Sequence, residues 1–382
     1  MTEHNDKNQV IIIGGGLAGL VSAIHLSKKG LQVLVIEKNT YPNHKVCGEY
    51  VSNEVLPYLE SIGFIPDTFD AKKIKKIDLS STKSNSIQAN LPLGGFSISR
   101  YTLDHELAKN AIKNGVTISI DTVVNIEFKK DTFFVYTKNN EIHTSRIAIG
   151  AYGKRANIDV KLKRTFIQND SPYLAIKGHY KGDFPEDLVG LHNFKGGYCG
   201  VSKIENNHIN ICYITTYKSF KKYKNIDDFQ DQVLCQNIHL KKLLKNTEVV
   251  FSKPISISQI SFSSKNLIEQ HILMCGDTAG MIHPLCGNGM GMAIHAAQIL
   301  STLILEYFNN KAISRQTLEK KYTLAWEKEF GQRLKMGRIL AVLFRINVFS
   351  ELVIWGLKIM PWLLPLIIKR THGKPLKPLT SL

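Results

Sequence analysis

The chain has 382 residues, 43% of them hydrophobic and 21% charged, which excludes a largely disordered protein and allows about two globular domains. Its formal net charge of +17 favours a partner that carries phosphate or acid, such as an anionic membrane, an acidic protein or a nucleic acid. The six cysteines form no CxxC pair, so we expect neither a metal site nor a disulfide framework, and free thiols are typical of the cytoplasm.

The first predicted elements are a strand, a glycine-rich loop, a helix and a second strand. The apolar run 10–13 predicts a buried parallel strand, and the loop 14–19 after it reads GGGLAG, which matches the GxGxxG dinucleotide-binding pattern. The second strand, 33–36, ends in Glu37, which can accept hydrogen bonds from a ribose diol. This order predicts a dinucleotide with its pyrophosphate at the helix N-terminus. The contacts expected from this unit are Gly14, Gly16, Leu17, Ala18, Gly19, Glu37 and Lys38.

A basic segment with one cysteine, residues 44–49, follows the second strand and reads HKVCGE. Lys45 and Glu49 can contact phosphate or sugar groups, and the thiol of Cys47 can donate a proton. Packing is the alternative for Cys47, because a free cysteine is usually a small buried hydrophobe.

The next predicted elements return to the first sheet. Segment 96–104 leads into a helix and places Arg100 near its start, and strands 116–120 and 123–126 follow. The apolar run 147–149 predicts another buried strand, which ends in Gly150-Ala151-Tyr152.

Period-two alternation indicates a second, strand-rich region. It is found at residues 76–80, 86–89, 174–180, 197–203, 208–215 and 252–258. Such alternation is typical of antiparallel strands with one buried face.

The last strand before the C-terminal region, 272–275, runs into Gly276-Asp277. The loop 284–291 follows and reads PLCGNGMG, and a helix is predicted from about Gly289. A glycine-rich loop at a helix N-terminus lets the backbone approach a flat ring and stabilise negative charge on it.

Together these motifs resemble those of the flavoprotein group that holds p-hydroxybenzoate hydroxylase, the ubiquinone-pathway hydroxylases and the geranylgeranyl reductases. The resemblance implies FAD as the cofactor, with Asp277 on its ribityl chain and the loop Pro284–Gly291 along its ring. It also implies that Arg100 lies near the flavin and Val124 near the adenine. The contacts added by the resemblance are Lys45, Cys47, Gly48, Arg100, Val124, Gly150, Ala151, Gly276, Asp277, Pro284, Gly287, Gly289 and Met290.

The expected fold class is α/β, with three parts. A FAD-binding Rossmann-like domain of the glutathione-reductase type is discontinuous and covers 1–78, 96–165 and 265–330. An inserted antiparallel-sheet substrate domain covers 79–95 and 166–264. A basic helical C-terminal region covers 331–382.

One similarity and two departures help to decide which branch of the group the chain resembles. The Cys47-Gly48 pair is similar to that of geranylgeranyl reductases, whereas hydroxylases of the p-hydroxybenzoate type lack it. True geranylgeranyl reductases usually show an aromatic YxWxFP segment, which is replaced here by Tyr198-Cys199-Gly200-Val201. Tyr152 replaces the acid of a G-A-D-G segment that, in the hydroxylases, helps with both FAD and NAD(P)H.

The motifs favour an FAD-dependent monooxygenase that hydroxylates an aromatic, polyketide-like or lipid-like substrate through a flavin hydroperoxide. The alternative is an ene-reductase that saturates double bonds of an isoprenoid or other lipid, and a third hypothesis is a non-catalytic FAD-binding protein. NAD(P)H is a candidate electron donor, although Tyr152 argues against direct nicotinamide use. The catalytic candidates are Cys47, His283 and Tyr198. His283 can act as an acid or base, and the alternative is a structural role.

The C-terminal region combines apolar runs with nine Lys/Arg and one acid, Glu351. No run in it approaches the roughly 20 residues needed to span a bilayer. Its composition, with Trp355 and Trp362, suits an interfacial helix on anionic lipid, and the alternative is a helical cap on the FAD domain. The N-terminus shows no signal-peptide pattern. We therefore expect a cytoplasmic protein that contacts the inner face of the cell membrane peripherally, and no nucleic-acid partner, because no recognised motif accompanies the charge.

Overall fold

The FAD-type motifs lie on a six-stranded sheet. A computed structural model describes residues 8–169, 171–223, 225–345 and 347–380. The strand order is β17-β18-β10-β1-β2-β6, and every neighbouring pair is parallel except β17 with β18. The strands are β1 (Val10–Ile13), β2 (Val33–Glu37), β6 (Thr117–Ile120), β10 (Ile147–Gly150), β17 (Ile268–Glu269) and β18 (Ile272–Met274). The predicted α/β class with an FAD-binding fold is confirmed.

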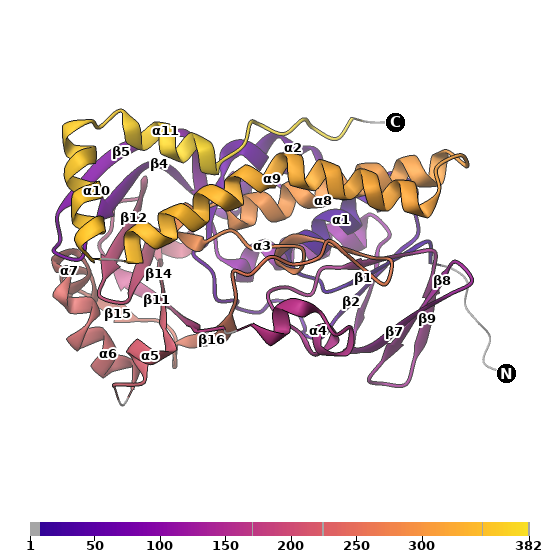
Figure 1. Cartoon of the computed structure of the whole chain (residues 1–382), viewed down its shortest axis with the longest axis horizontal. Coiled ribbons are helices and arrows are strands. Elements are labelled where there is room, and N and C mark those ends of the chain that lie inside the picture. The colour runs from indigo at the N-terminus through magenta and orange to yellow at the C-terminus, as the bar shows by residue number, and fades with distance from the viewer. Residues whose placement is uncertain (1–7, 170, 224, 346, 381–382) are drawn as a thin grey trace.

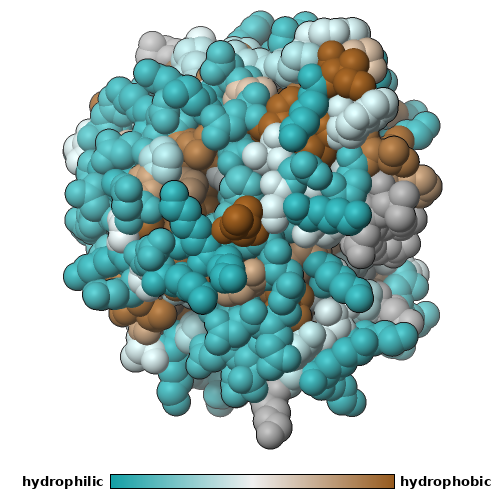
Figure 2. Space-filling model, turned by 90° about the vertical axis from the view of Figure 1, so that its left-hand side faces the viewer, coloured by the Kyte–Doolittle hydropathy of each residue, from teal (hydrophilic) through white to brown (hydrophobic). Residues whose placement is uncertain are grey.

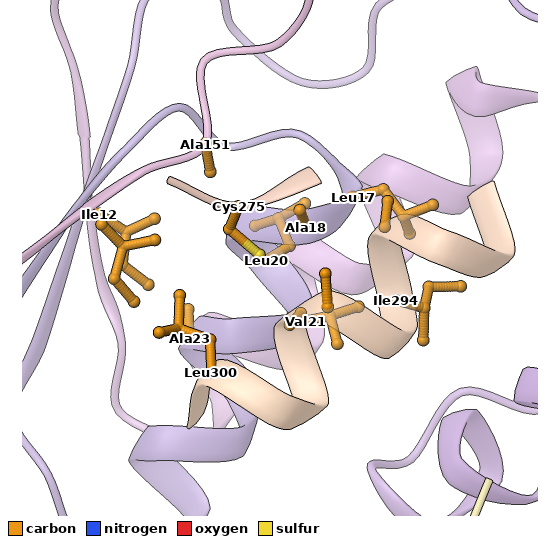
Figure 3. Close-up of a cluster of buried hydrophobic side chains, with 14 of the residues drawn as sticks. Ile12, Leu17, Ala18, Leu20, Val21, Ala23, Ala151, Cys275, Ile294 and Leu300 are labelled. Carbon is orange, nitrogen blue, oxygen red and sulfur yellow. The ribbon is translucent and has the colours of Figure 1, made fainter. Parts of the chain in front are cut away.

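Helices and a small sheet cover the six-stranded sheet (Figure 1). The strand β1 is buried along its whole length, because its apolar side chains meet helices on one face and β-structure on the other. Figure 3 shows α1 packed against α8, with Val21 facing Ile294 and Ala23 near Leu300. The covering elements are α1 (Leu17–Lys28), α2 (Leu56–Ser61), α3 (Arg100–Lys113), α4 (Asn157–Lys161), α8 (Gly289–Asn309), β7 (Val123–Lys129), β8 (Thr132–Thr137) and β9 (Ile142–Ser145).

A second, nine-stranded sheet forms the other half of the molecule. Its order is β15-β11-β14-β13-β12-β4-β5-β3, with β16 also paired to β11. Its pairs are antiparallel except β12 with β4, which are parallel. Strands β3 and β4 belong to this sheet. Residues 1–78, which include β3 and most of β4, were predicted to lie in the FAD domain. The strands are β3 (Tyr50–Ser52), β4 (Lys72–Ser80), β5 (Ser86–Ser97), β11 (Tyr173–Gly182), β12 (Leu188–Phe194), β13 (Gly197–Lys203), β14 (Ile209–Thr216), β15 (Thr247–Val249) and β16 (Ile255–Ile260).

Helices cover both faces of the second sheet. On one face α5 (Tyr217–Phe220), α6 (Ile226–Gln232) and α7 (Ile238–Lys245) bury an apolar cluster that includes Phe229 and Leu240. On the other face the C-terminal helices α9 (Arg315–Arg345), α10 (Asn347–Ile359) and α11 (Leu363–Thr371) bury a second cluster. The C-terminal region therefore caps the second sheet, whereas the first part of α9 packs against α8 of the FAD domain, on which the whole cap was predicted to lie.

The end of the chain is fixed to the FAD-binding half by a buried carboxylate, Glu54. This side chain accepts hydrogen bonds from Arg333 (3.2 Å), Asn288 (3.3 Å) and the amide of Gly373. Leu376 N donates to the Glu54 carbonyl at 2.7 Å. The tail thus closes over the start of α8.

One helix of the described residues, α8, is by itself long and apolar enough to cross a membrane, and 61% of that stretch is buried inside the protein. Helices α9 and α10 meet the same criterion only when taken together, as a pair bent by 110°. The burial of α8 is that of a core helix.

Candidate functional site

The predicted motifs meet where the parallel strands end. Because carboxyl ends of parallel strands share one edge, the segments that follow β1, β2, β10 and β18 lie together. Gly14 N donates to Ile36 O (2.8 Å), and Ala151 N donates to Ile13 O (2.8 Å). Cys275 N donates to Gly150 O at 2.9 Å, which brings the Gly276-Asp277 turn to the same edge.

Close packing explains two of the motif glycines. A Cβ on Gly19 would lie 2.0 Å from the carbonyl oxygen of Gly14, so any side chain there would push the helix off the loop. A Cβ on Gly276 would lie 2.8 Å from Cβ of Ala18, and Gly276 has φ of +63°. The two motifs, more than 250 residues apart, therefore touch directly.

Glu37 organises the glycine loop at the end of β2. Its carboxylate accepts hydrogen bonds from Gly15 N (2.7 Å) and Asn39 N (3.1 Å), and Tyr41 donates its hydroxyl proton to Gly15 O. Lys38, the next residue, is exposed. Glu37, predicted to bind the ribose, is thus buried and bonded to backbone amides, whereas Lys38 is directed to solvent.

The N-terminus of α1 has features that favour an anion. It carries no side-chain cap and no acid in its first turn. A Cβ on Gly16 would lie 3.7 Å from both Arg100 Nη2 and Lys45 Nζ, so two cations border the loop. The helix dipole and its free amides add positive potential at the same place.

Asp104 holds the two cations in position. Arg100 donates to both oxygens of its carboxylate at 2.7 Å, and Lys45 lies 2.9 Å from one of them. Burial alone would raise the pKa of Asp104, but Arg100 and then Lys45 outweigh it, so the pKa is lowered. Two cations on one carboxylate leave a net positive charge beside Gly16, which fits a pyrophosphate.

A second buried carboxylate, Glu49, anchors the HKVCGE segment to the nine-stranded sheet. It is ion-paired with Lys177 and lies 2.9 Å from His179 Nε2, both on β11. It also accepts a 2.7 Å hydrogen bond from Arg100 N. Burial raises the pKa of Glu49, but Lys177 and then His179 outweigh burial and lower it. The segment is thereby tied to both halves of the molecule.

Cys47 lies at the junction of those halves. Its thiol accepts from Glu49 N (3.4 Å), and its carbonyl accepts from Asn210 Nδ2 on β14 (3.2 Å). Its side chain is partly exposed and packs against the core of the FAD-binding half, whereas the preceding Val46 packs against the cluster under the C-terminal helices. Burial raises the pKa of Cys275 and of Cys286 to about 12, so these two stay protonated.

The Gly276-Asp277 turn is supported by two cations that sequence analysis missed. Lys265 Nζ donates to the carbonyls of Asp277 and Lys154, each at 2.8 Å. Burial lowers the pKa of Lys265 to about 8. Arg164, fully buried, donates to Thr278 O at 3.1 Å. The Asp277 side chain itself is partly exposed. Burial lowers the pKa of Arg100, but Asp104 outweighs burial and raises it, and Cys47 and Asp277 add smaller contributions.

Tyr152, which replaces the acid of the G-A-D-G segment found in the flavoprotein group, carries no charge. Tyr152 is largely buried beside β18, and its hydroxyl contacts Met274 Sδ at 3.6 Å. Burial raises its pKa, so it presents no charge to a ligand. Gly153 N donates instead to Thr278 Oγ1 at 2.8 Å, which connects this segment to the Asp277 turn.

The loop before α8 borders the second sheet. His283 packs 4.6 Å from the ring of Phe262 and 5.6 Å from the ring of Tyr198. Burial lowers the pKa of His283 to about 4, and its Nδ1 accepts from Leu285 N (3.4 Å), so this histidine is neutral and caps the turn. The Tyr198 hydroxyl is buried near the Leu285 backbone and forms no hydrogen bond of ordinary length within the described residues.

The remaining predicted contacts fall on the same loop or apart from it. Pro284 and Gly287 form a short turn, and Gly289 and Met290 open α8. Gly48 is exposed beside Cys47. Val124 lies at a pairing irregularity between β7 and β8, on the small sheet.

Comparisons with known proteins show the family. The model of the FAD binding domain family matches residues 7–323. A digeranylgeranylglycerophospholipid reductase of Methanosarcina acetivorans is 24% identical over 362 residues, covering 91% of this chain and 86% of that protein. Conditioned medium factor receptor 1 of Dictyostelium discoideum is 23% identical, covering 90% of this chain and 72% of that protein.

Solved structures share the fold. The flavin-dependent brominase Bmp2 superposes with a TM-score of 0.77 at 18% identity, covering 96% of this chain and 94% of its own. A geranylgeranyl bacteriochlorophyll reductase-like protein from Thermoplasma acidophilum gives 0.74 at 19% identity, with 91% of each chain covered.

Proposed function

The chain belongs to the FAD binding domain family and is an FAD-dependent oxidoreductase, and from this premise we propose that it saturates carbon–carbon double bonds of an isoprenoid or similar lipid. Sequence motifs alone favour a monooxygenase, and two observations reverse that order. The first is that digeranylgeranylglycerophospholipid reductases are among the relatives, and they are similar over 91% of this chain. The observation that carries the proposal is the position of Cys47 between the two halves.

The chain's own residues fit FAD. The uncapped start of α1 and the cations Arg100 and Lys45 suit the pyrophosphate, Glu37 suits the ribose, and Asp277 suits the ribityl chain. Reduced FAD would supply a hydride to one carbon of the double bond.

The protein must then deliver a proton to the other carbon. The Cys47 thiol is partly exposed, and the proposal assigns this proton to it. The Glu49 amide, already directed at the sulfur, would stabilise the thiolate left behind, as would the nearby Arg100 guanidinium. Water would return the proton after product leaves, so the thiol is regenerated and the net reaction adds two hydrogens.

Anaerobic flavin reoxidation tests this proposal. The FAD-loaded protein is reduced with dithionite and mixed, without oxygen, with a digeranylgeranyl phospholipid or geranylgeraniol, and absorbance of oxidised flavin is followed. We expect reoxidation and a product heavier by two hydrogens per double bond. Cys47→Ala should slow reoxidation by about 100-fold or more while FAD content stays unchanged, and Cys235→Ala is the matched control. Reoxidation that needs oxygen, or that Cys47→Ala leaves unchanged, contradicts the proposal.

A second candidate function is hydroxylation. Tyr198, Phe262 and His283 form an apolar wall beside the loop that precedes α8, and exclusion of water favours oxygen chemistry on a flavin. Oxygen-dependent incorporation of an oxygen atom into the substrate would support it. Replacing dithionite with NADPH or NADH in either assay tests the nicotinamide donor, which stays a proposal.

We also propose that the C-terminal helices contact an anionic membrane. On α10 the inward residues Ile354 and Leu357 are buried, whereas Leu352, Trp355 and Ile359 are 54–64% exposed. Trp362, at the turn before α11, is 60% exposed. The exposed Lys358, Lys369 and Arg370 lie among them. Figure 2, which faces the end of the molecule that carries α10, shows hydrophobic patches in a mainly hydrophilic surface.

This mixture suits the headgroup region, where tryptophan rings insert and each cation contributes about 1 kcal/mol near an anionic surface. It corresponds to a cytoplasmic protein held peripherally on the membrane. We expect sedimentation with vesicles containing phosphatidylglycerol, weakened by salt and by Trp355→Ser with Trp362→Ser. Equal binding to neutral vesicles, or none, contradicts it.

A further inference from the structure

Three potential metal ligands gather on the nine-stranded sheet, in a place that the FAD site does not use. Asp78 on β4, His192 on β12 and His239 on α7 each offer one ligand atom, and these atoms lie within 4.8 Å of one another. Asp78 and His192 are buried, and His239 is partly exposed. No metal site was predicted from the sequence, because its cysteines form no CxxC pair, and Asp78, His192 and His239 lie too far apart in the chain to form a recognisable motif.

The parallel pairing of β4 and β12 brings the first two ligands together. Asp78 is paired with Gly190, and Ser80 with His192. Since side chains alternate along a strand, Asp78 and His192 share a face of the sheet. A Cβ on Gly190 would lie 2.6 Å from His192 Nε2. Glycine at this position therefore leaves room for the imidazole to lean along its strand toward Asp78.

Helix α7 brings the third ligand. Its N-cap, Asn237, is fully buried and donates to Ser80 Oγ (2.9 Å), Ser81 O (3.1 Å) and Asn193 O (3.0 Å). These bonds fix the start of the helix on the sheet and place His239 beside His192. The two imidazole rings are parallel within 3°, with centroids 5.1 Å apart.

Hydrogen bonds outside the cluster orient both rings. His239 Nε2 lies 3.1 Å from Ser84 O, which can only accept, so the proton is on Nε2 and Nδ1 keeps a free lone pair. His192 Nδ1 lies 3.0 Å from Ser80 Oγ, and donation to that oxygen would leave Nε2 as the ligand atom. Metal-binding histidines are usually held in this way by their second nitrogen.

The carboxylate supplies an independent observation. Asp78 Oδ1 is buried and forms no hydrogen bond of ordinary length with the residues that the structure describes, although the side chains of Gln88 and Ser86 lie near the carboxyl group. A buried carboxylate oxygen without a partner is costly. A cation beside it would remove that cost.

We propose that Asp78, His192 and His239 bind a divalent transition-metal ion, for which Zn²⁺ is the best match. Two imidazoles and one carboxylate suit Zn²⁺, whereas Mg²⁺ and Ca²⁺ prefer oxygen ligands alone. Bond lengths of about 2.0–2.2 Å require the three side chains to draw closer together. Water would complete the coordination on the exposed side of His239.

The ion would join α7 to two strands of the sheet, so its first effect is on stability. After dialysis against a chelator, the full-length FAD-loaded protein is titrated with Zn²⁺ in competition with a chromophoric chelator. We expect one equivalent bound and a melting temperature raised by about 3–5 °C at saturation. Mg²⁺ should have no such effect.

Two ligand variants and one control separate this site from other histidines. His239→Gln, at a partly exposed position, and Asp78→Asn should each weaken Zn²⁺ binding by about 100-fold or more and abolish the melting shift. His143→Gln, a partly exposed histidine on β9, should bind as the original protein does. If a ligand variant fails to fold, Co²⁺ absorbance bands from nitrogen and oxygen ligands in the original protein still test the site. Failure of the original protein to bind Zn²⁺, or binding that His239→Gln leaves unchanged, overturns the proposal.

Discussion

Replacing Lys177 with methionine should destabilise the protein sharply, because Glu49 would keep its buried charge without its main partner. Both side chains are completely inaccessible to solvent, and Lys177 Nζ also donates to Lys45 O at 3.2 Å. Removing one member of a buried ion pair costs about 3–5 kcal/mol. At about 2–3 °C per kcal/mol for a chain of this size, Lys177→Met should lower the melting temperature by roughly 6–15 °C.

The dependence on pH gives this prediction a sign. In the folded protein the pKa of Glu49 is lowered, so its stabilisation is present above the ordinary glutamate pKa and is lost as pH falls through the folded value. Without Lys177, burial dominates and the folded pKa of Glu49 rises. The protonated carboxyl then becomes the favoured buried form, so the deficit of the variant should shrink between pH 7 and pH 5.

Urea unfolding followed by tryptophan fluorescence at pH 7 and pH 5 measures both effects. The double variant Lys177→Met with Glu49→Gln should be more stable than Lys177→Met alone, because the unpaired charge is gone. Lys181→Met, at an exposed position of the same strand, is the control and should change stability by less than about 0.5 kcal/mol. A Lys177→Met deficit below about 1 kcal/mol, or one that is equal at both pH values, would refute the reasoning.

Three further predictions concern the FAD site. Gly19→Ala places a Cβ 2.0 Å from Gly14 O and should yield protein without bound flavin, as read from the absorbance of the purified protein; a full flavin complement would contradict the packing argument. Arg100→Met removes a cation that would lie 3.7 Å from a Cβ built on Gly16. It should weaken FAD binding by about 10- to 100-fold, as measured by flavin fluorescence titration. An unchanged affinity would count against the proposed pyrophosphate contact of Arg100. Burial lowers the pKa of Lys265 to about 8, so its unfavourable buried charge is fully present below pH 8. Between pH 8 and pH 10 the original protein should gain stability relative to Lys265→Met by up to about 1.4 kcal/mol per pH unit. Lys75→Met, at the surface, should show no such difference, and a Lys265→Met profile parallel to that of the original protein would show that Lys265 does not titrate in this range.

The parts of the site that follow from local spacing could be predicted from sequence. The glycine loop and the turn at Asp277 each begin with a glycine at the end of a strand, Glu37 is the last residue of β2, and the parallel order of the strands brings all three to one edge. The cofactor follows from these motifs, and the family match confirms it. The roles of individual contacts stay predictions.

The parts that depend on register across the chain could not be predicted. Glu49 meets Lys177 and His179 across about 130 residues, and only the placement of β11 in the second sheet sets that contact. A charged Lys177 within an alternating strand was the one available hint. The same holds for Asp78 and His192, which meet because β4 and β12 pair in parallel, an arrangement that the expected antiparallel sheet did not include.

The hydrogen bonds that Glu54 forms with the C-terminal region have a consequence that follows from the order in which the parts of the protein are synthesised. Arg333 and Gly373, which bind Glu54, come after all the predicted cofactor motifs along the chain, and Leu379 N donates to Ser61 Oγ on α2. The nascent chain therefore exposes a complete set of cofactor-binding motifs, from Gly14 to Met290, before its own closing segment exists. A chain that ends before Arg333 would keep these motifs but lack the bonds from Arg333, Gly373 and Leu376 to Glu54.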